Sequence, residues 1–83
     1  PMFTLTPVVP DVPLKDCAIG DILRKEFHTE SGMLHYTVLV RWVFNDDNPD
    51  HREFHGRILE STVTQVAREG EMAYFTFENF TKV

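Results

Sequence analysis

The strongest constraint on the fold is an alternation of apolar and polar residues over Met33–Phe44. Every second residue there is bulky and apolar, and the set is Leu34, Tyr36, Val38, Val40, Trp42 and Phe44. Successive side chains of a strand point to opposite faces, so this set shares one face. The pattern predicts a central β-strand whose apolar face, rings included, fills the core. Leu39 and Val43 on the second face favour a curled or closed sheet, which would cover part of that side too.

Residues 14–28, before this strand, fit two structures. As a strand, Ile22–His28 begins after a turn at Gly20 and pairs with the central strand across a turn at 29–32. As a helix, residues 14–27 would present one apolar stripe, although Gly20 would weaken it by about 1 kcal/mol. We favour the strand and keep the helix, packed on a three- or four-stranded antiparallel sheet, as the alternative.

The remaining segments read mostly as extended chain. Residues 2–13 carry three prolines, so they form at best a short edge strand before crossing the surface. Residues 45–50 are a polar turn. Residues 51–68 read as a strand in which Gly56 allows a bend or bulge, with a helix over 58–68 as the alternative. The last predicted strand, residues 72–80, supplies further core rings: Tyr74, Phe75, Phe77 and Phe80.

The fold predicted is therefore mainly β, a small antiparallel meander curled into an SH3-like or OB-like barrel. At 83 residues the chain has room for one core, so residues 1–83 are expected to form a single domain. Pro1 stands before Met2, the usual initiator, and is expected to be a residue left by cloning.

Composition argues against nucleic acid as the partner. The formal charge is −5, and the eight Lys and Arg residues are spread along the chain, so a nucleic acid would be approached against net repulsion. A nucleic-acid-binding small barrel stays as the alternative function. Its contact residues would be Arg24, Lys25, Arg41, Arg52 and Arg57.

Catalytic and metal-binding patterns are weak. The four glycines are isolated, no serine lies in a nucleophile turn, and the single cysteine, Cys17, has apolar neighbours typical of a buried filler. His51, Glu53 and His55 share one strand face, but a third imidazole or a cysteine at a fixed spacing is missing. We expect no catalysis, no cofactor and no metal.

Binding to another protein is the function that remains. We expect a small non-catalytic protein, an inhibitor or modulator of the kind that phages and mobile elements encode, or else a structural or assembly subunit. We expect it in the cytoplasm, with neither a membrane segment nor a secretory signal. A homodimer through a sheet edge is a further possibility. The predicted partner-binding residues are Asp46, Asp47, Asp50, Tyr74 and Phe80.

Overall fold

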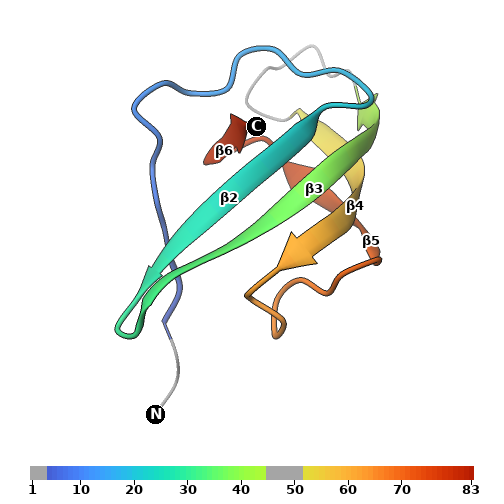
Figure 1. The fold of residues 1–83 in the computed structure, drawn as a ribbon. Coiled ribbons are helices and arrows are strands. Elements are labelled where there is room, and N and C mark those ends of the chain that lie inside the picture. Colours follow the sequence, from blue (N-terminus) through green and yellow to red (C-terminus); the bar gives the residue numbers. More distant parts are fainter. Residues whose placement is uncertain (1–3, 45–51) are drawn as a thin grey trace.

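The computed structural model describes residues 4–44 and 52–83, and all regular structure in these ranges is β-strand. The strands are β1 (Thr6–Pro7), β2 (Ile22–Thr29), β3 (Gly32–Phe44), β4 (Glu53–Ser61), β5 (Met72–Thr76) and β6 (Phe80–Lys82). All pairs are antiparallel, and β2 to β5 are neighbours in chain order. The short β6 returns to pair with β2, so the sheet curls on itself (Figure 1). The predicted mainly β, curled meander is confirmed.

The β2–β3 hairpin decides between the two predictions for residues 14–28. Ile22–Thr29 forms a strand that runs beside β3 up to a tight turn after Thr29. Gly20 has a φ of 97°, a conformation that an α-helix does not contain but that glycine adopts freely in a turn. The predicted strand is confirmed, and the helix over 14–27 is wrong.

Two further predictions need correction. After β4 the chain makes a single helical turn, in which the Ala67 N–H donates to the Val63 carbonyl at 2.8 Å, so the helix over 58–68 is wrong. The predicted strand over 72–80 is broken into β5 and β6 by a turn at Asn79, whose φ is 63°. Asparagine tolerates this left-handed conformation better than most residues, and the turn redirects Phe80 towards β2.

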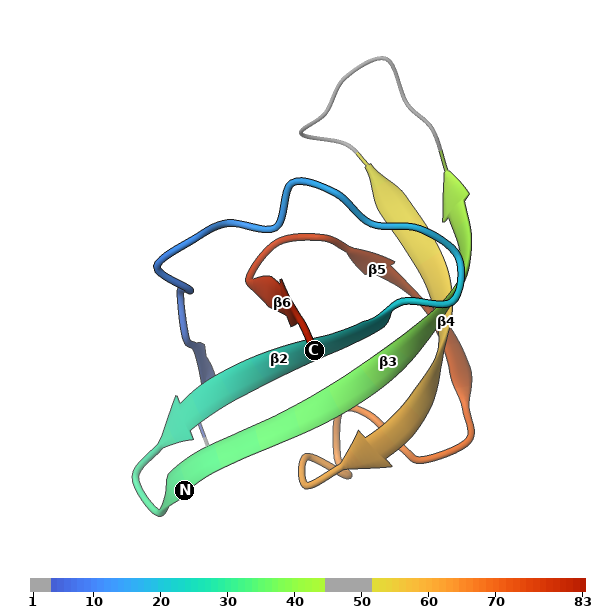
Figure 2. The same cartoon turned by 45° about the horizontal axis from the view of Figure 1, so that its top comes forward.

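The core is a cluster of aromatic and aliphatic side chains inside the curl. The Phe54 ring lies at its centre, 4.7 Å from Phe77, 5.2 Å from Phe75 and 5.3 Å from Phe80 between ring centroids. The extended segment between β1 and β2 crosses the open side of the curl (Figure 2). Leu14 from this segment packs against the core, so the proline-containing segment is part of the hydrophobic structure.

The interior alternation of β3 ends at a β-bulge. Val40 pairs with Gly56 and Trp42 pairs with His55, so Arg41 is an extra residue opposite the β4 ladder. Because side chains alternate with a period of two, one extra residue exchanges the two faces of the strand beyond it.

The bulge corrects the central prediction for this strand. Tyr36 and Val38 are buried as predicted, but Trp42 and Phe44 point outward and are 56% and 40% exposed. Val43, predicted for the opposite face, packs against the core instead. The prediction that the rings of Trp42 and Phe44 fill the core is therefore wrong.

Gly56 allows the close strand approach at the bulge. A Cβ atom at this position would overlap the Cγ1 atom of Val38 and would come within 2.9 Å of the Leu39 carbonyl oxygen. Any larger residue would have to push β4 away from β3 at the point where the sheet curls.

We therefore expect Gly56→Ala to lower the free energy of unfolding by about 1–3 kcal/mol, the usual cost of overpacking. Part of this cost should disappear in a Val38→Ala background, since the overlapping methyl group is then absent. Urea denaturation of the four variants of this cycle measures both effects. An unchanged midpoint, or the same cost in both backgrounds, would contradict the close approach.

The buried Tyr36 phenol predicts a loss of stability in alkali. Burial raises the pKa of Tyr36 to about 12, above its unfolded value of about 10. Between these values the folded state keeps a proton that the unfolded state has lost, so stability falls as the pH rises through this window. In urea denaturation, the free energy of unfolding should therefore fall less between about pH 9 and pH 11 for Tyr36→Phe than for the wild type. An identical pH dependence of the two proteins would contradict the raised pKa of Tyr36.

Candidate functional site

Four rings from three strands lie together on the outer side of the sheet. Trp42 and Phe44 come from β3, His55 from β4 and Tyr74 from β5, and we call this set the aromatic face. The His55 and Tyr74 rings are stacked, with centroids 4.4 Å apart and an angle of 14° between planes. Phe44 packs on Tyr74 at 5.8 Å. Tyr74 is itself 67% exposed, so its ring is held by His55 and Phe44 while much of its surface meets water, and Trp42 lies opposite His55 in the β3–β4 register.

Strand register explains why these rings meet. The Ile58 N–H donates to the Glu71 carbonyl at 2.9 Å, which makes 58 and 71 a hydrogen-bonded pair of the β4–β5 ladder. Such pairs alternate along antiparallel strands, so His55 and Tyr74 form a non-hydrogen-bonded pair. Side chains of those pairs lie closest together, which accounts for the stacked rings.

The same alternation leaves the backbone of β5 open on its far side. Met72, Tyr74 and Thr76 direct their N–H and C=O groups away from β4, and among the described strands β5 pairs with β4 alone. The strand reads Met-Ala-Tyr-Phe-Thr, without the charges or proline that commonly block a sheet edge. Within residues 4–44 and 52–83, no strand pairs with these backbone groups, which lie beside the aromatic face.

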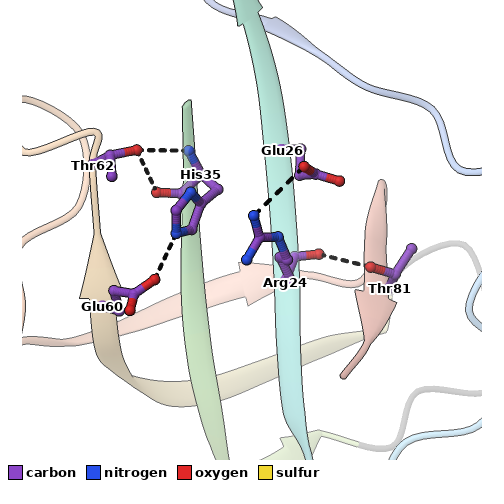
Figure 3. A network of polar contacts seen from close by, with 6 residues as sticks. All are labelled: Arg24, Glu26, His35, Glu60, Thr62 and Thr81. Atoms are coloured by element: carbon purple, nitrogen blue, oxygen red, sulfur yellow. Dashed lines mark hydrogen bonds and ion pairs between the residues drawn. The ribbon is translucent and has the colours of Figure 1, made fainter. Parts of the chain in front are cut away.

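The opposite end of the outer face is polar (Figure 3). His35 Nε2 shares a hydrogen bond of 2.6 Å with Glu60 Oε1, and the His35 backbone N–H donates to the Thr62 hydroxyl at 2.9 Å. Arg24 and Glu26 form an ion pair at 3.6 Å. These polar groups are paired with one another within β2 and between β3 and the end of β4, whereas the two most exposed large apolar side chains of the sheet, Tyr74 and Trp42, lie at the aromatic end.

The predicted partner-binding residues have three different outcomes. Tyr74 lies at the centre of the aromatic face. Phe80 is 1% exposed and packs edge-on against Phe54 and Tyr36, so its prediction as a surface anchor is wrong. The turn at Asn79 sends it inward. The three predicted acidic contacts lie outside the described residues: Asp46, Asp47 and Asp50.

Three of the five basic residues of the nucleic-acid alternative lie on or near the outer face. Arg41 is exposed at the bulge, beside Trp42. Arg57 is exposed and donates from Nη1 to the Gly70 carbonyl at 3.0 Å. Arg24 lies at the polar end and is paired with Glu26.

The other two basic residues face the inner side. The Lys25 ammonium lies 5.7 Å from the Phe27 ring centroid and 5.4 Å from that of Phe80. Burial lowers the pKa of Lys25, while the nearby charge of Glu78 opposes the shift. Arg52 stacks over Phe77 at 4.9 Å. The five cations therefore do not form one continuous basic face.

The weak metal candidates are only partly described. Glu53 and His55 both point outward from β4, and the His55 ring is stacked on Tyr74. His51 lies outside the described residues. Within residues 4–44 and 52–83, no three His, Cys, Asp or Glu side chains converge as metal ligands.

The sequence interpretation missed Trp42, Phe44 and His55 as surface contacts. In a regular strand without a bulge, position 41 would also lie on the more polar face, so Arg41 fits the alternation in either case. The alternation therefore does not reveal the bulge. Two weaker signals were present. Gly56 marked a bend or bulge, and the apolar Val43 stood on the face opposite to the other core residues.

Comparisons with protein-family models, curated protein sequences and solved structures found no match. In the described part of the chain, no helix is long and apolar enough to cross a membrane. The function is therefore inferred from the residues of the aromatic face and their surroundings.

Proposed function

We propose that this chain is a non-catalytic protein-binding module whose principal contact surface is the aromatic face. The observation that carries the proposal is the exposure of Trp42, Phe44 and Tyr74 on one face of neighbouring strands, with Phe44 packed on Tyr74 and Trp42 opposite His55. Exposed apolar side chains are ordinary when scattered, whereas contiguous ones mark interaction sites. Their surface would leave water when a partner binds.

The residue types are those that dominate protein interfaces. Trp, Tyr and Arg are the side chains whose truncation most often costs binding energy, and Arg41 and Arg57 flank the rings. The stacking of Tyr74 on His55 and Phe44 fixes its ring before contact, which lowers the entropy lost on binding. The face supports a pre-organised anchor for an apolar surface of another protein.

The open edge of β5 suggests the form of the contact. An extended segment of the partner could add to β5 through the outward backbone groups of Met72, Tyr74 and Thr76. Side chains of that segment on the outer side would then lie beside the aromatic face. The acidic residues Asp46, Asp47 and Asp50 remain proposed secondary contacts that would attract a basic partner.

This binding would act by occupying a partner's surface, as an inhibitor, modulator or assembly subunit does. We also propose that it takes place in the cytoplasm, where a single unpaired cysteine such as Cys17 is typical. A single-stranded nucleic acid is the competing ligand, because bases stack on exposed rings. The inward positions of Lys25 and Arg52 favour the protein partner over it.

Affinity capture from the native cell with matched variants tests the proposal. The wild type is compared with Trp42→Ala/Tyr74→Ala and with Val9→Ala/Val66→Ala, which removes two exposed apolar side chains elsewhere. The captured protein is then purified and titrated. We expect the face variant to bind it at least about tenfold more weakly and the control to bind it unchanged.

Equal affinity of the face variant and the wild type would overturn the proposal. Salt-dependent binding to single-stranded DNA or RNA that is lost in the same variant would instead support the nucleic-acid alternative. Folding of each variant is checked by urea denaturation, so that loss of binding is not mistaken for loss of structure.

A second copy of this chain is the second candidate partner, favoured by the uncharged edge of β5. In such a dimer, β5 would pair antiparallel with β5 of the second copy, with Tyr74 opposite Tyr74 and Met72 opposite Thr76. The backbone groups of these three residues that point away from β4 would then all form hydrogen bonds. The two aromatic faces would then join into one continuous surface.

Charge substitution at Tyr74 tests this dimer. Tyr74→Lys and Tyr74→Glu would each place like charges directly opposite one another, so each should be monomeric by sedimentation equilibrium. A mixture of the two should dimerise again, because opposite charges then face each other. A monomeric wild type at all accessible concentrations, or a mixture that stays monomeric, would contradict the dimer.

A further inference from the structure

A second candidate site lies on the inner side of the molecule, where the N-terminal segment passes the turn between β5 and β6. A hollow of about 280 Å³ there is lined by Leu14, Lys15, Cys17, Arg52 and Phe77, and we call it the Arg52 hollow. It adjoins a more open groove of about 470 Å³ that shares Leu14, Arg52 and Phe77.

The charge of the Arg52 hollow is opposite to that of the chain. Lys15 and Arg52 are cations and none of the described lining residues is acidic, although Glu78 lines the adjoining groove and the whole protein carries a formal charge of −5. The nearby Asp21 is already engaged, since its Oδ2 atom lies 3.1 Å from Lys82 Nζ and accepts the Ala18 N–H at 2.8 Å. The hollow is therefore a local basic site on an acidic protein.

Arg52 is positioned to bind an anion. Its guanidinium carbon Cζ lies over the Phe77 ring, 4.9 Å from the centroid, which leaves N–H groups that can point towards a ligand in the hollow. Among the described residues, no carboxylate forms an ion pair with it. A planar guanidinium held in this way matches the two oxygens of a carboxylate or a phosphate.

The rest of the lining is apolar. Leu14 and Phe77 pack against the core and present the remainder of their surface to the hollow. Burial raises the pKa of the Cys17 thiol, and Asp21 raises it further, so the thiol is a neutral lining group. A ligand with only a charged head would leave this apolar surface uncovered.

We propose that the Arg52 hollow binds a small amphiphilic anion, with a carboxylate or phosphate head on Arg52 and Lys15 and a short apolar body against Leu14 and Phe77. The volume lies just below the range of about 300–1,000 Å³ that is usual for small-molecule sites, which restricts the body to a short alkyl chain or a single ring. The site does not depend on the aromatic face, because its residues point to the opposite side of the sheet.

Titration of the labelled protein followed by NMR tests the proposal with three probes: octanoate, octyl phosphate and 1-octanol. We expect the two anions to shift the amide signals of residues 14–17, 52 and 77 and to bind about tenfold more tightly than the neutral alcohol. The ratio of the two anions tells which head group is preferred. Shifts confined to other regions, or equal affinity for 1-octanol, would overturn the proposal.

Matched variants identify the head-group contact. Arg52→Gln should weaken octanoate binding about tenfold, Arg52→Lys should restore part of it, and Arg57→Gln on the outer face should leave it unchanged. Trp42→Ala/Tyr74→Ala should also bind octanoate normally, which separates this site from the proposed protein contact. Full affinity in Arg52→Gln, with the fold intact, would contradict the assignment of Arg52.

Discussion

The β-bulge at Arg41 is the feature on which the rest of this structure depends. Because of this bulge, the alternating apolar side chains of one continuous strand point into the core up to Val40 and towards the outer surface from Trp42 onwards. The bulge is possible because Gly56 brings β4 against β3 without a side chain in between. One extra residue therefore both curls the sheet and turns two large rings into water.

The curl divides the molecule into two surfaces of different chemistry. Inside it, Phe54 gathers the rings from β5, β6 and the connecting turn into one core, and the N-terminal segment crosses the opening. Outside it, ion pairs and hydrogen bonds occupy one end of the sheet and the aromatic face the other. The proposed protein contact and the proposed anion site lie on opposite sides, so both could be occupied in the same molecule.

Much of this fold could be predicted from the sequence, because local patterns determine it. The alternation up to Val40 predicted the core strand, and the turn residues before Met33 predicted the hairpin. The wrong predictions share one cause, because each depends on a backbone conformation that residue types specify only weakly. The extra residue at Arg41 shows only weakly in the pattern of polar and apolar residues, through Val43, and the left-handed turn at Asn79 is a backbone conformation that this pattern does not encode. The aromatic face depends on both strand register and the bulge, so the sequence identified only Tyr74 among its members.

The fluorescence of Trp42, the single tryptophan of the chain, tests the bulge most directly. In dilute solution, where no second copy is bound, an outward Trp42 should emit at the long wavelength of an indole in water. Acrylamide should quench it readily, and unfolding in urea should change both properties little. Blue-shifted emission that acrylamide quenches poorly until the protein unfolds would place the ring in the core and contradict the account.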